Sequence, residues 1–210
     1  MKVALVAAAS LAALTLAACN QNTGTNSETP EGPGQSEAAN TVQDAAAGAV
    51  GQASAATLGS LTTGAYVENA ARGDLYEIES SRLAQERTQN AQIREMAGMI
   101  IADHTRSTQG LQAAIREGNA QETPPTTLDE RRQGLIDNLR AASAADFDTV
   151  WRTQQVAAHE EALTLHQGFA ERGDNAALQA HARATAPVVQ RHLEALQRMN
   201  GAAPAPATEG

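Results

Sequence analysis

The sequence predicts an all-α fold, a four-helix bundle with one long crossover that carries a short extra helix. Apolar residues recur at helical spacing throughout residues 61–200. Only 2% of the residues are aromatic, so the core is built from aliphatic side chains and alanine, which suit packed helices better than a β-sandwich. Four long apolar stripes then make a bundle the simplest way to bury them.

The first two long helices are expected at about 63–88 and 91–117. Leu75, Ile78 and Leu83 mark the apolar side of the first, with Gly73 as a weak point. The second carries its stripe from Ile93 to Ile115 and ends at Gly118, a residue type common at helix C-termini. The following QETPPTT cannot continue a helix because of its paired prolines, and so begins the crossover.

The second half of the bundle is expected to contain a shorter segment and two long helices. The segment 128–142 carries Leu135 and Leu139 within the crossover. The long helices are expected at about 146–172, around Trp151, and at about 175–199. Pro187 falls inside the last one, so we expect a kink or a restart there, near Thr185. A bundle with one such crossover is typical of ferritin-like folds.

The chain begins with features of a secretory signal. A single lysine, Lys2, precedes the uncharged stretch 3–18, which is too short and too rich in alanine for a stable membrane span. Residues 16–19, LAAC, resemble a bacterial lipobox. That resemblance implies cleavage before Cys19, a diacylglycerol on its sulfur and stable anchoring by two or three acyl chains. Asn20 in place of Asp favours the outer membrane by analogy with enterobacterial sorting. The alternative is an unmodified thiol after an ordinary signal.

These features divide the chain into four parts. We expect a lipoprotein signal peptide at 1–18, a disordered acidic tether at 19–60, the helical bundle at 61–200 and a disordered tail at 201–210. The tether is rich in small and polar residues and cannot bury enough apolar area to offset its chain entropy. Its alanine-rich portion, 41–56, is expected to be helical only transiently.

Charge and motif content exclude several functions. The net charge is −9, and the arginines are scattered, so the sequence has no basic cluster of the kind that binds nucleic acids. Cys19 is the only cysteine, and its lipidation removes thiol catalysis, zinc–thiolate sites and an internal disulfide. The sequence has no glycine-rich phosphate loop and no Gly-x-Ser-x-Gly turn. We therefore do not expect an enzyme.

Each long helix carries one titratable residue predicted to face inward: Glu79, His104, His159 and His192, with Asp103 at the edge of its stripe. One interpretation is a mononuclear His/Glu site for Fe, Zn, Cu or Mn. The other is a hydrogen-bonded core network of these five residues, which fixes helix register. No histidine has a Glu three residues before it, so the di-iron pattern of ferritins is absent. The other histidines, His166 and His181, are expected to be partly exposed.

Three stretches resemble the bacterial family called "domain of unknown function 4142": EIESSRLAQERTQNAQIREMAGMIIADHTRSTQGL, LRAASAADFDTVWRTQQVAAHEEAL and APVVQRHLEAL. The resemblance covers about 66–199. It implies a ferritin-like bundle in a secreted or outer-membrane protein, and no reaction. The family's recurring features correspond here to residues on all four long helices: Glu77-Ile78-Glu79, Met99, Asp103, His104, Phe147-Asp148, His159, Pro187 and His192.

The sequence thus predicts a lipid-anchored outer-membrane protein that presents a helical bundle to the periplasm. Its specific activity is unknown, and we expect a non-enzymatic envelope or stress-related role. The alternative is a metal-binding protein that uses Glu79, His104, His159 and His192. The expected partner is the membrane, through the acyl chains on Cys19, and the sequence indicates no protein partner. A scaffold that binds another envelope protein through its helix faces is a third possibility.

Overall fold

The computed structural model describes residues 37–57 and 61–201, and within these ranges it contains six α-helices and no strand. This confirms the predicted all-α fold. The predicted signal peptide, Cys19, the remainder of the predicted tether and residues 202–210 of the tail lie outside the described residues. The helices are α1 (Glu37–Thr57), α2 (Thr63–Arg87), α3 (Ala91–Glu117), α4 (Glu130–Ala141), α5 (Phe147–Arg172) and α6 (Ala176–Gly201).

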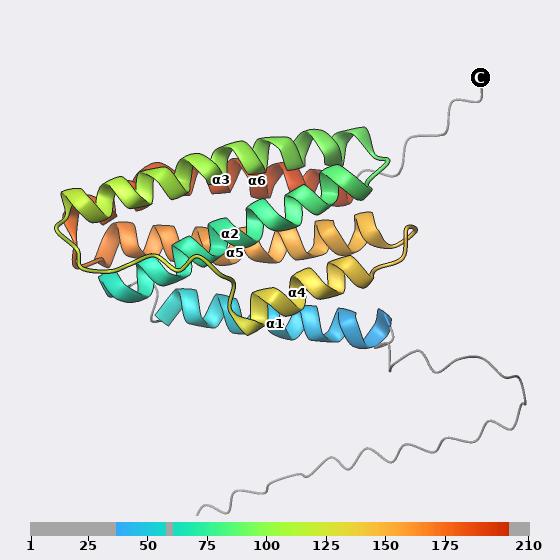
Figure 1. Cartoon of the computed structure of the whole chain (residues 1–210), viewed down its shortest axis with the longest axis horizontal. Coiled ribbons are helices and arrows are strands. Elements are labelled where there is room, and N and C mark those ends of the chain that lie inside the picture. Colours follow the sequence, from blue (N-terminus) through green and yellow to red (C-terminus); the bar gives the residue numbers. More distant parts are fainter. Residues whose placement is uncertain (1–36, 58–60, 202–210) are drawn as a thin grey trace, which may run out of the picture. The chain divides into compact units, whose positions relative to one another are not determined.

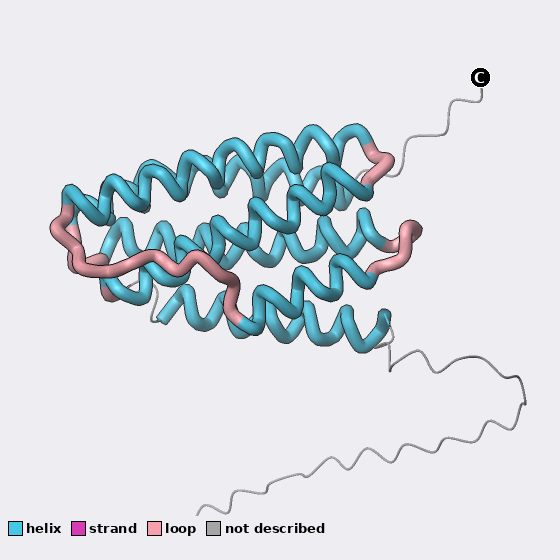
Figure 2. Tube along the Cα trace, viewed as in Figure 1, coloured by secondary structure: helices cyan, strands magenta, loops and turns pink. Residues whose placement is uncertain are grey.

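The four long helices α2, α3, α5 and α6 form the bundle (Figure 1). Around the bundle α2 packs on α3, α3 on α6, α6 on α5 and α5 back on α2. The crossover from α3 to α5 runs along the bundle as an extended loop and then forms α4, which packs on α2 and α5 (Figure 2). Among the described residues, no helix is long and apolar enough to cross a membrane.

Helix α1 corrects the prediction of a disordered tether, because residues 37–57 fold against α5 and α4. Polar contacts hold it there: the Asp44 carboxylate accepts hydrogen bonds from Asn138 and Gln154, both at 2.7 Å. Small residues allow the close approach, since a Cβ at Gly51 would collide with the Glu161 side chain. Local composition predicted disorder because it does not reveal these partners, which are side chains more than 90 residues away in the sequence.

The helix ends follow local sequence signals. The side chains of Thr62, Asn90 and Asp129 accept hydrogen bonds from backbone N–H groups in the first turns of α2, α3 and α4. Gly118 is the C-cap of α3, as predicted, but the residue with positive φ is Asn119, at 50°. Gly118 is needed for space instead, because a Cβ there would overlap the side-chain amide of Asn175, which donates to the Gly118 carbonyl at 3.0 Å.

Two sequence expectations about helix faces are corrected. Leu75 and Ile78 are only partly buried, and the inward face of α2 instead carries small and polar residues, including Asp74 and Glu77. On the side of α2 that α4 covers, the residues packed with Leu135 and Ile136 of α4 are Tyr76 and Leu83. Helix α6 is continuous through Pro187, so it does not restart near Thr185. The Thr185 hydroxyl donates to the His181 carbonyl at 3.0 Å in the turn before the proline.

Changing Gly73 to Ala should raise the free energy of unfolding by about 0.5–1 kcal/mol. Gly73 lies inside α2, and a Cβ there would meet no atom within 4 Å, so alanine limits the unfolded chain without a steric cost. Urea unfolding measures the change. The matched control is Gly118→Ala, which should be destabilising because its Cβ overlaps Asn175. A destabilising Gly73→Ala would contradict the described packing.

Candidate metal centre

Three histidines from three helices meet in the middle of the bundle. His104 on α3, His159 on α5 and His192 on α6 are 3%, 0% and 6% exposed. One nitrogen from each ring lies within 4.8 Å of the other two. Their ring centroids are 5.5–5.9 Å apart. The sequence predicted that these three residues face inward, and the structure brings them together. Three buried histidines at this separation could hold a metal ion.

In each of the three rings one nitrogen, here called the outward nitrogen, lies beside its own hydrogen-bond acceptor; the other is called the inward nitrogen. His104 Nδ1 lies 2.8 Å from the Asp74 carboxylate, and His192 Nε2 lies 2.9 Å from the Asp103 carboxylate. His159 Nδ1 lies 2.9 Å from the Gln155 carbonyl, one turn earlier in α5. Carboxylates and carbonyls only accept, so each of these ring nitrogens carries the proton. Such contacts fix the tautomer and orientation of metal-bound histidines.

The inward nitrogens are consequently without protons in the neutral rings. His159 Nε2 and His192 Nδ1 lie 3.4 Å apart, yet neither can donate to the other when both outward nitrogens are protonated. His104 Nε2 is buried and has no hydrogen-bond partner. When all three rings are neutral, three nitrogens without protons lie close together, and a cation between them would stabilise that arrangement.

The spacing is compatible with a small transition-metal ion. Two nitrogens bound to a tetrahedral zinc at about 2.0–2.1 Å are about 3.3 Å apart, close to the 3.4 Å between His159 Nε2 and His192 Nδ1. Since all three ligand atoms lie within 4.8 Å, the remaining gaps would have to close by at most about 1.5 Å.

The electrostatic environment favours neutral imidazoles at two of the three positions. Burial lowers the pKa of His159 well below its usual value, and the neighbouring His104 and His192 lower it further. Burial also lowers the pKa of His192, against the opposing effect of Asp103. For His104, burial is outweighed by the hydrogen bond and charge of Asp74, so its pKa is raised. A metal competes with the proton for these nitrogens, and neutral rings bind it most readily.

The glutamate that lies beside the histidines is Glu77 rather than Glu79. Glu79, predicted as a ligand and network member, instead pairs with Arg140 at 2.7 Å and has a side chain that is 38% exposed. Glu77 is 2% exposed, and its Oε1 lies 3.4 Å from His159 Nδ1. Burial raises the pKa of Glu77 to about 7, against the lowering effects of His104 and Gln155.

Asp103 lies at the edge of the cluster, as predicted, and joins it to the surface. Its carboxylate accepts from His192 and also from Arg106, whose side chain is exposed. Burial would raise the pKa of Asp103, but the hydrogen bonds from Arg106 and His192 hold it below its usual value. A cavity of about 230 Å³ between α3 and α6 is lined by Asp103, His104 and His181, so it reaches one of the three clustered histidines.

Sequence reasoning missed Asp74, which orients His104 and also accepts from Thr108 at 3.2 Å. A signal was present: Val67, Ala70, Asp74, Glu77, Ser81 and Ala84 follow helical spacing along α2. These residues are all buried in the structure. Because these residues are small or polar, the series does not stand out as an apolar stripe in the sequence.

The other two histidines form a second group. His166, expected to be partly exposed, is 3% exposed, and its Nδ1 lies 3.0 Å from the Tyr66 hydroxyl. His181 is partly buried, with its ring centroid 6.0 Å from that of His166. Tyr66 also stacks on Phe169 at 4.0 Å between ring centroids. This group therefore lies within the aromatic part of the core.

Comparison with known protein families gives one match: a family described as "Domain of unknown function (DUF4142)" matches residues 27–199. The chain belongs to this family. The matched DUF4142 region includes α1 as well as the bundle, in agreement with the packing of α1 on α4 and α5. No curated protein and no solved structure matches the chain.

The stability of this DUF4142 domain should fall as the pH drops below about 6.5, in part because of His166. Burial lowers the pKa of His166 from its usual 6.5 to about 3, so between these values the unfolded chain binds a proton that the folded chain excludes. That difference costs about 1.4 kcal/mol of folding free energy per pH unit. Urea unfolding from pH 7 to 4.5, with chelator present, measures it.

The matched variant is His166→Gln, which lacks the titrating ring. Its free energy of unfolding should decline less steeply with falling pH than that of the wild-type chain, by about 1.4 kcal/mol per pH unit. Equal slopes in the two proteins would show that His166 is not held neutral.

Proposed function

We propose that this protein binds one transition-metal ion between His104, His159 and His192. The observation that carries the proposal is that three buried inward nitrogens face one another, while each outward nitrogen has its own acceptor. The competing interpretation, a satisfied core network, leaves His104 Nε2 without a partner and the 3.4 Å contact between His159 and His192 without a proton. A bound ion satisfies all three nitrogens at once.

The chemistry of the ligands narrows the choice of ion. Three neutral imidazoles without a thiolate suit Zn, Cu or Fe, and Mn is the weakest competitor among the four ions considered. The 3.4 Å nitrogen separation fits a tetrahedral ion such as zinc, with the fourth position open. Asp74 and Asp103 act through the rings, because each accepts the outward N–H and raises the basicity of the ligand nitrogen.

Metal loading of the full chain tests the proposal. Chelator-treated protein is dialysed separately against Zn²⁺, Cu²⁺, Fe²⁺ and Mn²⁺, and bound metal and melting temperature are then measured. We expect about one ion per chain for at least one of these metals, together with a higher melting temperature, since binding to the native state stabilises it.

The matched variants are His159→Gln and His166→Gln, which each remove one fully buried imidazole from α5. His159→Gln should lose stoichiometric metal and the gain in melting temperature, whereas His166→Gln should retain both. Substoichiometric metal with no thermal gain in the wild-type chain would overturn the proposal. Equal metal content in the two variants would also overturn it.

We further propose that the protein is a lipoprotein of the bacterial cell envelope, anchored through acyl chains on Cys19 and facing the periplasm from the outer membrane. The support is the sequence: Lys2, the uncharged stretch 3–18 and the LAAC at residues 16–19. In this proposal the metal site is held close to a membrane surface, in a non-enzymatic, envelope or stress-related role.

Changing Cys19 to Ser should abolish lipid attachment, because the serine has no thiol to acylate. In a bacterium fed a labelled fatty acid, the wild-type chain should carry the label and sediment with outer membranes. The Cys19→Ser chain should carry no label. Label on the serine variant, or none on the wild-type chain, would contradict lipid anchoring, and wild-type label in the inner membrane would contradict the sorting.

A further inference from the structure

A second, larger cavity lies beneath α1, and His104 lines both this cavity and the one between α3 and α6. It has a volume of about 440 Å³ and is bounded by α1, α2, α4 and α5. This volume falls in the range of small-molecule sites in proteins. Its wall is mostly apolar and includes Tyr76, Leu135, Val150 and Leu165 together with several alanines. An apolar molecule could therefore fill it.

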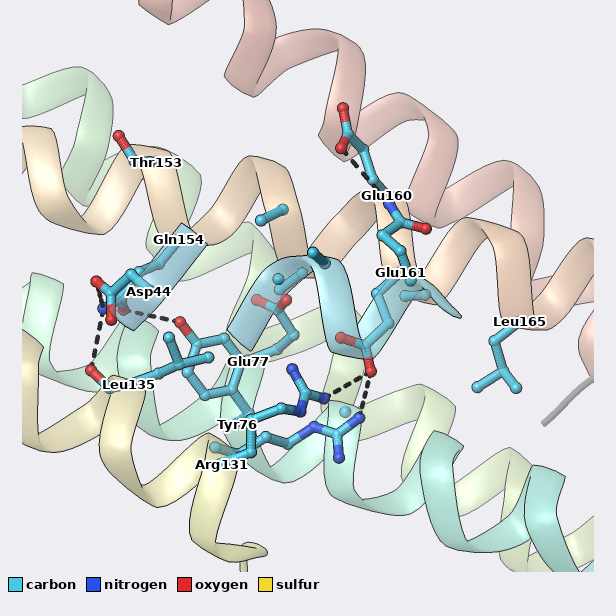
Figure 3. A pocket seen from close by; sticks show the side chains of 18 of the residues that line it. Asp44, Tyr76, Glu77, Arg131, Leu135, Thr153, Gln154, Glu160, Glu161 and Leu165 are labelled. Carbon is cyan, nitrogen blue, oxygen red and sulfur yellow. Dashed lines mark hydrogen bonds and ion pairs between the residues drawn. The ribbon is translucent and has the colours of Figure 1, made fainter. Parts of the chain in front are cut away.

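Carboxylates outnumber guanidinium groups around this cavity. The acidic residues that line it are Asp44, Asp74, Glu77, Glu160 and Glu161, and the basic ones are Arg131 and Arg132 together with the imidazoles of His104 and His166. Both arginines already donate to Glu161, at 2.8 and 2.6 Å (Figure 3). The field inside the cavity therefore favours a positive charge over a negative one.

Most of these carboxylates are already hydrogen-bonded. Asp44 accepts from Asn138 and Gln154, while Asp74 accepts from His104 and Thr108. Glu160 has a longer contact with Gln52, at 3.5 Å. Each has a protein partner that offsets part of the cost of its burial.

Glu77 differs from the others. It lies among the residues that line the cavity (Figure 3). Neither of its buried carboxylate oxygens accepts a hydrogen bond of good geometry, although the neighbouring Gln155 side chain lowers its pKa. Its nearest ring donor, His159 Nδ1 at 3.4 Å, already donates to the Gln155 carbonyl at 2.9 Å. A buried carboxylate without a partner is costly, so this position favours a donor or a cation supplied from the cavity.

We infer that the cavity beneath α1 binds a small organic cation with an apolar body, an amine whose ammonium group donates to Glu77. The apolar wall covers the body of such a ligand, and the carboxylate excess selects its charge. Asp74 and His104 both line this cavity, but the proposed contact is with Glu77 and does not require a metal to be bound.

Three probes with the same apolar body test this inference: adamantan-1-amine, adamantan-1-ol and adamantane-1-carboxylate. Each is titrated calorimetrically into the full chain after metal has been removed with a chelator. We expect the amine to bind about tenfold or more tightly than the alcohol, since a hydrogen bond to a buried charge gains about that much. The carboxylate should not bind measurably.

Variants separate charge from cavity volume. Glu77→Gln keeps the shape and should bring the affinities for amine and alcohol within about twofold of each other. Its matched control, Glu86→Gln on the exposed face of α2, should keep the wild-type preference. Gly73→Leu should weaken all binding by filling the open space at that position, and Gly73→Ala should keep it.

The inference is overturned if the wild-type chain binds none of the probes, or binds amine and alcohol equally. It is also overturned if Glu77→Gln keeps the amine preference in a protein whose circular dichroism shows a folded bundle. Should Glu77→Gln fail to fold, the three-probe series on the wild-type chain and Gly73→Leu decide the outcome. None of these results depends on metal binding, which is measured separately.

Discussion

The bundle is organised around three buried histidines, each of which brings one ring nitrogen within 4.8 Å of the other two. His104, His159 and His192 can adopt this arrangement only because the opposite edge of each ring is held by Asp74, Gln155 or Asp103. Those contacts come from all four long helices. A slip of any one helix by a turn would leave a buried nitrogen or carboxylate unpaired, at a cost of about 1–3 kcal/mol. The polar centre therefore fixes the register of the bundle as well as forming the proposed site.

The same constraint explains the unusual inward face of α2. This helix supplies no histidine, and its buried residues near the centre are Asp74 and Glu77. Small residues such as Ala70 and Gly73 leave space beside them, and α1 covers that space without filling it. The metal centre and the cavity beneath α1 thus share a wall, in which Asp74 faces His104 and Glu77 lies near His159.

Much of this arrangement could be predicted from the sequence. Periodicity gave the long helices to within two residues at each end, because each has a clear apolar stripe or a cap such as Asn90. Three of the four predicted inward residues meet, since histidines in the middle of an apolar stripe have little alternative to the core. The position of Glu79 could not be predicted, because α4 brings Arg140 to that side of α2 and stabilises the glutamate there. The folding of α1 depends equally on distant partners, Asn138 and Gln154, which local composition does not reveal.

The most direct test of the central claim is to locate the metal by anomalous scattering from a crystal of the metal-loaded chain. The account predicts one ion at about 2.0–2.1 Å from His104 Nε2, His159 Nε2 and His192 Nδ1, with Asp74, Gln155 and Asp103 still accepting from the outward nitrogens. An ion bound elsewhere, or a centre left empty in a crystal grown with saturating metal, would contradict it.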